Sequence, residues 1–123
     1  MSTYHDIANR YVDCWNETDA GARREAIAAL WTEDASYVDP LGEASGHDAI
    51  DATIAAVQER FPGFAFRLAG PVDGHHDQLR FSWELGPRGA DAPIAGFDVA
   101  LTDGDGRLRT VLGFLDRVPV GAV

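Results

Sequence analysis

Tyr37-Val38-Asp39-Pro40-Leu41-Gly42 is the stretch from which the fold of this 123-residue chain is worked out. Alternation before it puts Ala35, Tyr37 and Asp39 on one face of a strand. Pro40 has no backbone N–H, so the strand ends directly after the carboxylate. A carboxylate that faces an apolar side is costly unless it is paired or used. Asp39 is therefore a candidate functional residue, although strand-end aspartates also commonly accept hydrogen bonds from the following turn.

Two helices are expected before this strand. Ile7, Tyr11 and the pair Cys14-Trp15 recur at helical spacing and predict a first amphipathic helix from about Thr3 to Asn16, with Tyr11 on its inner side. Thr18 and Asp19 are candidate N-caps for a second helix that runs to about Trp31.

A third helix is expected after the strand. Leu41 to Ala44 form a turn, and Ser45 followed by Asp48 resembles a capping box. The helix then ends at Pro62-Gly63. Its apolar residues recur at intervals of four, three and four positions and are Ile50, Ile54, Val57 and Phe61.

The rest of the chain alternates like strands. The expected strands are residues 64–68, 79–85, 93–102 and 107 to about 118, with a hairpin signal at Asp103-Gly104-Asp105-Gly106. Helices followed by a meander of strands predict a single α+β domain over residues 1–123, in which three helices cover one side of a curved, mostly antiparallel sheet.

The strand at 93–102 has no plainly polar face. Phe97, Val99 and Leu101 lie on one side, while Asp98 shares the other side with small and apolar residues. Two covered faces on one sheet suggest a second contact surface beyond the helices, and a homodimer through the outer sheet face is our preferred explanation.

Composition excludes several function classes. The net charge is −10, with ten arginines and no lysine, so nucleic acid or an anionic membrane would be repelled. Cys14 is the only cysteine, no segment has signal-peptide character, and no run reaches membrane-spanning length. We expect a cytoplasmic protein whose partner is a small hydrophobic ligand.

The chain resembles the nuclear transport factor 2-like (NTF2-like) superfamily, in its SnoaL-like branch, and within that branch the ketosteroid isomerases. The resemblance is clearest over residues 26–42, which carry the family's "DDA"-type turn and its "DP-x-G" strand end, and over residues 97–108, its last hairpin. It implies a cone-shaped sheet that encloses an apolar pocket with its helices.

The resemblance also implies roles for three residues. Asp39 falls at the position of the general base, while Tyr11 and Asp98 fall at the positions of the oxyanion hole. The expected chemistry is removal of a proton next to a carbonyl and its return one allylic position away, with no cofactor. Candidate substrate-binding residues are Trp31, Tyr37, Ile54, Phe61, Trp83 and Phe114.

Alternatives remain open at this stage. Tyr11 could be an ordinary core tyrosine, and Asp98 would face outward if the parity of its strand were reversed. Where the isomerases support the oxyanion tyrosine with further tyrosines, this chain has Trp31 and Ile54. A non-catalytic binding or dimerisation module, a polyketide cyclase and an epoxide hydrolase are the other functions considered. No metal site is expected, because the adjacent His75 and His76 point to opposite faces of a strand.

Overall fold

The computed structural model describes residues 3–119; Met1, Ser2 and residues 120–123 of the expected domain lie outside this range. Helix α1 is Tyr4–Asn16 and has a capping box at Thr3 and Asp6, in which each side chain accepts from the other residue's backbone N–H. Helix α2 is Ala20–Leu30, and its N-cap is Asp19. Trp31, which we expected to end this helix, instead begins the first strand.

Helix α3 is His47–Arg60, and its start differs from the prediction. The N-cap is Gly46, with φ at 84° and no side-chain hydrogen bond, so Ser45 and Asp48 do not form a capping box. The chain turns into the helix in a conformation that glycine adopts without steric cost and other residues rarely adopt. Ser45 is instead the last residue of a short strand that the sequence pattern did not reveal.

The seven strands form one mixed sheet in the order β2-β1-β7-β6-β5-β3, with β4 paired to β5. Their bounds are β1 Trp31–Asp39, β2 Gly42–Ser45, β3 Phe64–Leu68, β4 Asp73–His75, β5 Gln78–Pro87, β6 Ile94–Thr102 and β7 Leu108–Arg117. All pairs are antiparallel except β1 with β7. This arrangement confirms the α+β prediction.

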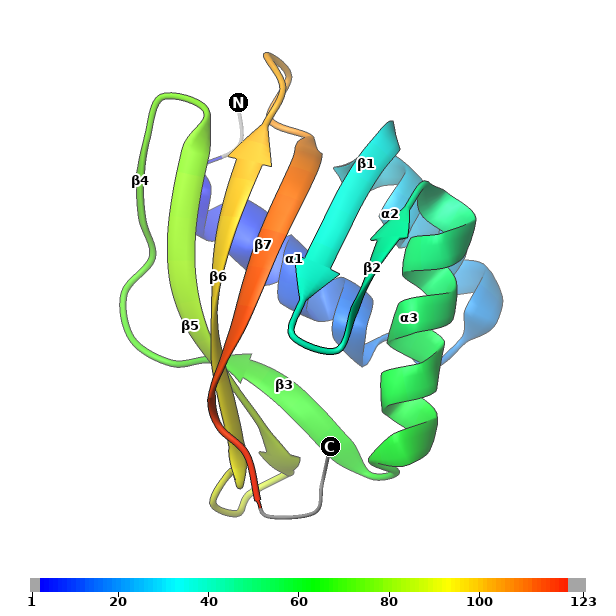
Figure 1. Cartoon of the computed structure of the whole chain (residues 1–123), viewed down its shortest axis with the longest axis vertical. Helices are drawn as coiled ribbons and strands as arrows, with labels where there is room; N and C mark the ends of the chain where they lie inside the picture. The colour runs from blue at the N-terminus through cyan, green and yellow to red at the C-terminus, as the bar shows by residue number, and fades with distance from the viewer. Residues whose placement is uncertain (1–2, 120–123) are drawn as a thin grey trace.

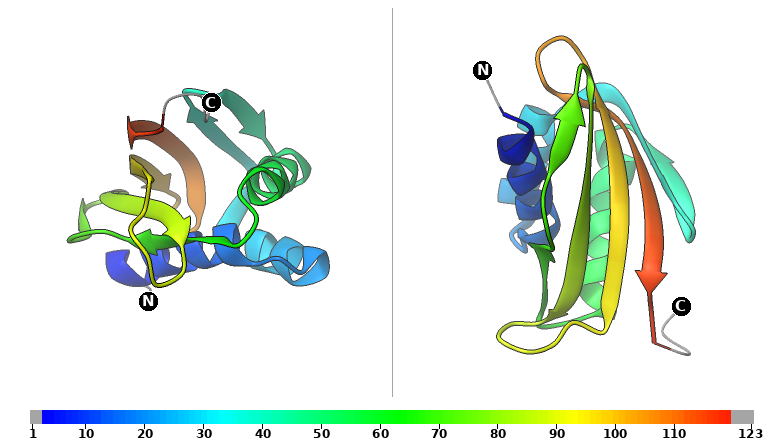
Figure 2. Two further views of the ribbon diagram at one scale, coloured as in Figure 1. Left: turned by 90° about the horizontal axis from the view of Figure 1, so that it is seen from below. Right: turned by 90° about the vertical axis from the view of Figure 1, so that its left-hand side faces the viewer.

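The sheet bends strongly around the helices. Helix α1 crosses behind the long strands, and α3 lies beside β1 and β2 (Figure 1). Seen from below, the strands curve around the side of the molecule that α1 and α3 cover (Figure 2). The buried core lies between these layers and joins residues of α1, such as Ala8, to residues of the sheet, such as Val111.

The helices are also joined by an ion pair. Arg23 of α2 donates from its Nε to Asp51 Oδ1 of α3 at 2.6 Å, and both residues are buried. A buried charge needs such a partner, because the desolvation cost is otherwise uncompensated. The pair fixes α3, and with it the pocket wall that α3 supplies.

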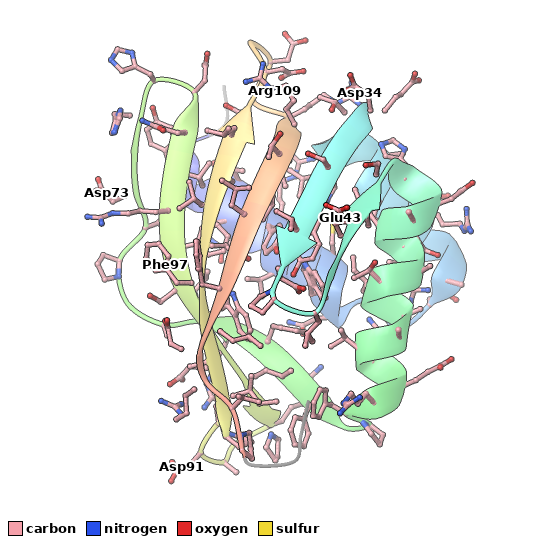
Figure 3. The ribbon with its side chains drawn as sticks, viewed as in Figure 1. Asp34, Glu43, Asp73, Asp91, Phe97 and Arg109 are labelled. Carbon is pink, nitrogen blue, oxygen red and sulfur yellow. The ribbon has the colours of Figure 1, made fainter. Side chains whose placement is uncertain are left out.

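The outside of the molecule is acidic. Asp34, Glu43, Asp73 and Asp91 are all exposed, and their side chains extend from four different parts of the chain (Figure 3). Among the described residues, no helix has the length and apolar character that crossing a membrane requires.

Candidate active site

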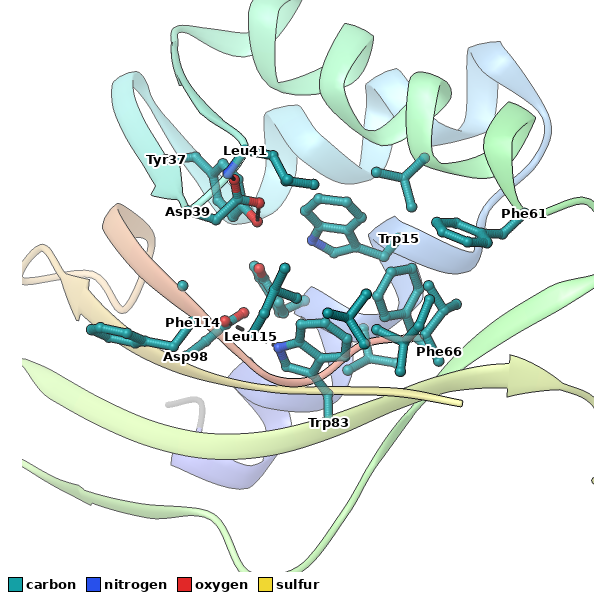
Figure 4. Close-up of a pocket in the computed structure, with 17 residues that line it drawn as sticks. Trp15, Tyr37, Asp39, Leu41, Phe61, Phe66, Trp83, Asp98, Phe114 and Leu115 are labelled. Atoms are coloured by element: carbon teal, nitrogen blue, oxygen red, sulfur yellow. Dashed lines mark hydrogen bonds between the residues drawn. The ribbon is translucent and has the colours of Figure 1, made fainter. Parts of the chain in front are cut away.

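A pocket opens between the inner face of the sheet, α1 and the end of α3 (Figure 4). Its cavity volume is about 60 Å³, and its walls are mainly apolar and aromatic. The lining residues are Tyr11, Val12, Trp15, Tyr37, Asp39, Leu41, Val57, Phe61, Phe66, Trp83, Leu85, Ile94, Asp98, Gly113, Phe114, Leu115 and Val118. A largely apolar hollow with a few converging polar groups is typical of a small-molecule site.

Three segments far apart in the sequence bring Tyr11, Asp39 and Asp98 to the wall of this one pocket. Asp98 faces inward on β6 and is 2% exposed, so the outward-facing alternative is excluded. Tyr11 is equally buried, at 3%. It is a core tyrosine and a pocket residue at the same time.

Asp39 is held by three hydrogen bonds. The Tyr37 hydroxyl donates to Oδ2 at 2.6 Å, and the backbone N–H groups of Leu41 and Gly42 donate to Oδ1 at 2.9 and 3.2 Å. The turn contacts are the ones expected of a strand-end aspartate that Pro40 follows. These three donors fix the direction of the Asp39 carboxyl group at the pocket wall.

Asp98 has a different environment. Burial raises the pKa of its carboxyl group to about 6; hydrogen bonds from Tyr11 and Trp83 oppose this shift, and the nearby charge of Asp39 adds to it. The Trp83 Nε1–H donates to Oδ1 at 3.1 Å. Two acids with such different surroundings in one apolar site are able to divide the acid and base roles.

Gly96 makes the Trp83 contact possible. It lies directly opposite Trp83 in the ladder between β5 and β6, and a Cβ atom there would lie 2.1 Å from Cζ2 of the indole. The indole therefore lies flat over the glycine and reaches Asp98, two residues further along β6. A side chain at position 96 would displace it.

Tyr11 contributes a hydroxyl that stays protonated. Burial raises the pKa of Tyr11 well above its ordinary value, and the neighbouring Asp98 raises it further. The ring is fixed by aromatic neighbours, with centroids 5.3 Å from Phe81 and 5.9 Å from Trp31. A rigid phenol beside an acid of raised pKa can donate a hydrogen bond to a ligand oxygen.

Gly113 is a site residue that sequence reasoning missed. A Cβ atom on it would lie 3.0 Å from Asp98 Oδ1, 3.3 Å from Asp39 Cβ and 3.5 Å from the Tyr37 hydroxyl. Both acids and a tyrosine therefore converge on the space that this absent side chain leaves. The glycine stands opposite Asp98 in the β6–β7 ladder, and that register is what the sequence did not reveal.

The expected binding residues have three different placements. Tyr37, Phe61 and Trp83 line the pocket, but Trp31 and Ile54 do not, because both are fully buried in the core beneath it. Phe114 belongs to the lining, yet its ring is turned away from the cavity and the residue is 54% exposed (Figure 4). Successive side chains of a strand point to opposite faces, and Gly113 and Leu115 face inward. Phe114 therefore faces outward, unlike the inward-facing binding residue that we expected.

Trp15 and Phe66 were not among the predicted site residues. Trp15 lies one turn after Tyr11 on α1, so the i, i+4 spacing was the signal that could have identified it. Its indole packs against Tyr37 and Phe66, with ring centroids at 5.5 and 5.3 Å. Phe66 in turn packs against Trp83, which closes an aromatic wall.

Other reactive groups lie away from this pocket. His75 ends β4 and His76 follows it in an exposed turn, and neither belongs to the lining. Within residues 3–119, no group of three metal-binding side chains comes together. Burial raises the pKa of the Cys14 thiol to about 12, which makes it a poor nucleophile.

The chain is similar to known proteins over most of its length. A family model described as a SnoaL-like domain matches residues 8–111. A "putative isomerase of the SnoaL-like family" from Agrobacterium tumefaciens str. C58 is 41% identical; the match covers 94% of this chain and 99% of that one, with a TM-score of 0.89. No curated protein matches the sequence.

Two further solved structures share the fold at lower identity. An NTF2-like protein from Exiguobacterium sp. 255-15 is 23% identical over 89% of this chain and 98% of its own, with a TM-score of 0.71. A "putative polyketide cyclase" from Sinorhizobium meliloti is 18% identical over 91% and 99%, with a TM-score of 0.70. The family model and the Agrobacterium relative together show that the chain belongs to the SnoaL-like family of the NTF2-like superfamily.

Proposed function

We propose that this protein is a cofactor-independent enzyme that moves a proton next to the carbonyl group of an apolar cyclic ketone. One observation carries the proposal: Asp39 and Asp98, two acids in contrasting environments, converge on Gly113 in an apolar pocket. The 41% identical relative, described as a "putative isomerase of the SnoaL-like family", supports the same class of reaction.

In the proposed reaction, Asp39 is the base. Its carboxylate takes a proton from the α-carbon of a β,γ-unsaturated ketone, and the electron pair of the broken C–H bond forms a new C=C bond as the carbonyl electrons move onto oxygen, which gives a dienolate. Tyr37 and the two turn N–H groups hold the carboxylate in one orientation, and Oδ2 retains lone-pair capacity beside its tyrosine bond. The protonated Asp39 then returns the proton to the γ-carbon, and the base is regenerated.

Tyr11 and neutral Asp98 stabilise the enolate oxygen in this proposal. Each would donate an O–H hydrogen bond to the oxygen on which negative charge develops, in a site whose apolar walls strengthen such bonds. Trp83 holds the Asp98 carboxyl group through Oδ1, which leaves Oδ2 to carry the proton.

The alternatives have less support. Epoxide hydrolysis through an Asp-Arg-Asp arrangement would need an arginine, and none occurs among the described residues that line the pocket. Polyketide cyclisation is suggested by structures under 25% identical, which share the fold alone. Binding without turnover is an outcome that the following experiment detects.

Asp39→Asn tests the proposal. The amide keeps an oxygen for the turn N–H groups but cannot accept the proton, so turnover should fall by at least about 100-fold. The assay follows conversion of a β,γ-unsaturated steroid ketone to its conjugated isomer by ultraviolet absorbance, together with exchange of α-protons for deuterium. Glu43→Gln, an equal change of charge on exposed β2, is the control and should retain activity. Ketone binding without exchange in the unsubstituted protein would leave only a ligand-binding function.

A further inference from the structure

The cavity of the pocket is small. Its volume is about 60 Å³, whereas sites that hold drug-sized ligands usually enclose about 300–1,000 Å³. One water molecule needs about 10–15 Å³ of such space, so the cavity has room for about four to six water molecules. Because bonded atoms lie closer together than water molecules do, a single six-membered ring with its carbonyl oxygen fills this space. Further fused rings of a larger ketone would remain outside it.

An aromatic wall closes the end of the pocket that lies away from the acids. Phe66 is at this end, and Asp39 and Asp98 are at the other (Figure 4). The Phe66 ring packs against Trp15 and Trp83, with ring centroids 5.3 Å away in both cases. Trp15 is buried in the core, and Trp83 is held by its hydrogen bond to Asp98. The rings that flank Phe66 are therefore fixed.

The backbone of Phe66 is fixed as well. Its N–H donates to Asn16 Oδ1 at 2.7 Å, and Asn16 Nδ2 donates to its carbonyl oxygen at 2.9 Å. Strand β3 is an edge strand that pairs with β5, so the Asn16 side chain ties its other side to α1. Phe66 could move aside for a longer ligand only if these hydrogen bonds were broken.

We propose that the substrate is a monocyclic ketone and that Phe66 sets this size limit. The inference rests on the proposed function and names its substrate class. A ring that fills the space in front of Phe66 brings its carbonyl group to Tyr11 and Asp98. Its α-carbon then lies toward Asp39. A steroid ketone can insert only the ring that carries its carbonyl group, so the reaction can proceed while the other rings add little to binding.

The test compares the binding of cyclohexanone with that of 2-decalone, which has the same ring ketone and a second fused ring. Both are saturated, so neither is isomerised during the measurement. Dissociation constants are obtained from titrations followed by tryptophan fluorescence. In an apolar pocket without a size limit, each buried CH₂ group strengthens binding about fourfold, and the second ring would strengthen it about 100-fold. In this protein we expect a gain of no more than about threefold.

Phe66→Ala should remove the size limit. The second ring can then occupy the space that the phenyl group leaves, so 2-decalone should bind at least about tenfold more tightly than cyclohexanone. Phe64→Ala is the matched control: Phe64 lies on the same face of β3 and stacks on Phe61, but it is not part of the pocket lining. This variant should keep the ratio of the unsubstituted protein.

Near-ultraviolet circular dichroism checks that each variant is folded. If Phe66→Ala does not fold, Phe66→Leu takes its place, because leucine keeps apolar packing but reaches less far, and the preference for 2-decalone should then rise at least about threefold. A gain of tenfold or more from the second ring in the unsubstituted protein would overturn the inference. An affinity ratio that neither substitution of Phe66 changes, or that Phe64→Ala changes equally, would overturn it too.

This result is separable from the test of Asp39, because binding requires no turnover. If Asp39→Asn exchanges protons as fast as the unsubstituted protein while Phe66→Ala gains preference for 2-decalone, the proposed reaction fails and the size limit stands. If Asp39→Asn is inactive but the unsubstituted protein already binds 2-decalone far more tightly than cyclohexanone, the reaction stands and the monocyclic substrate is rejected.

Discussion

Asp98 shows most clearly how the environment of one residue controls the chemistry of this site. Its carboxyl group is 2% exposed and accepts from Trp83, and the pKa of about 6 lies just below neutrality. A modest change of pH therefore converts it from a neutral donor into a second negative charge beside Asp39. Activity and stability should both respond to this change.

If neutral Asp98 donates to the enolate, kcat/KM should fall as the pH rises above about 6, by about tenfold per pH unit, because the donor form of the free enzyme is being lost. Asp98→Asn keeps a donor at every pH. This variant should have a lower maximum but no fall in kcat/KM between pH 6 and pH 8. The same alkaline decline in Asp98→Asn would assign it to another group.

Stability should depend on the same carboxyl group. The pKa of Asp98 is raised in the folded state, so the folded protein binds more protons than the unfolded chain between pH 4 and pH 6, and stability decreases as the pH rises through that range. Complete ionisation of Asp98 lowers the free energy of unfolding by about 3 kcal/mol, and about 1 kcal/mol of this loss occurs between pH 5 and pH 7. Urea unfolding of Asp98→Asn and the unsubstituted protein at these two pH values measures the difference. A free energy gap between them that does not change with pH would contradict the raised pKa.

At the level of elements, the ladder between β6 and β7 assembles the site. Asp98 stands opposite Gly113, and Gly96 stands opposite Leu115, so two glycines leave room on the inner face for an acid and an indole. Parallel pairing of β1 with β7 then brings Asp39 to the same place. The spacing between the acids is therefore set by the register of three strands.

Gly113→Ala tests this register. The added methyl group would lie 3.0 Å from Asp98 Oδ1 and 3.3 Å from Asp39 Cβ, which is tighter than ordinary contact, so the acids must move apart by a few tenths of an ångström. We expect turnover to fall about 10- to 100-fold while the free energy of unfolding changes by no more than about 1 kcal/mol. Gly104→Ala, at a hairpin position with open space around the new methyl group, is the control. Equal activity in the two variants would show that the space at Gly113 is not used.

Local elements could be predicted from the sequence because their signals are local. The Asp19 cap, the apolar stripe of α1 and the hairpin at Asp103 each lie within a few neighbouring residues. The strand β2 was missed because its four residues carry no alternating pattern. The α3 cap was misassigned because the positive φ of Gly46 provides a start that needs no side chain.

At the scale of the whole molecule, site residues supplied by distant segments were harder to predict. The resemblance placed Asp39 and Asp98 on inward faces, and the burial of Asp98 on β6 agrees, although alternation alone had left the direction of Asp98 open. The position of Gly113 opposite Asp98 and the outward direction of the Phe114 ring depend on how β7 pairs with β6, and no short sequence pattern specifies that pairing. Trp31 and Ile54 were assigned to the pocket because position alone does not separate a second layer of core from a lining residue.

We expect a homodimer to form through the outer face of the sheet. Val38, Leu112 and Val99 are paired in one row across β1, β7 and β6, and Phe114 and Phe97 are paired in the next. Leu112 and Val38 are each 37% exposed, and charged residues flank their row, with Glu43 paired beside Val38 and Arg80 beside Val99. A continuous apolar area on an otherwise acidic protein would gain free energy by covering itself with a second copy.

Leu112→Glu is therefore expected to convert a dimer of about 27 kDa into a monomer of 13.3 kDa, because symmetry would bring two new carboxylates together in an apolar interface. Sedimentation equilibrium over a range of concentrations measures the mass. Leu41→Glu makes the same change at an exposed leucine in the turn after β1, away from these rows, and should keep the mass of the unsubstituted protein. A mass of 13.3 kDa for the unsubstituted protein at every concentration would reject the dimer, and loss of association in both variants would assign the interface to another surface.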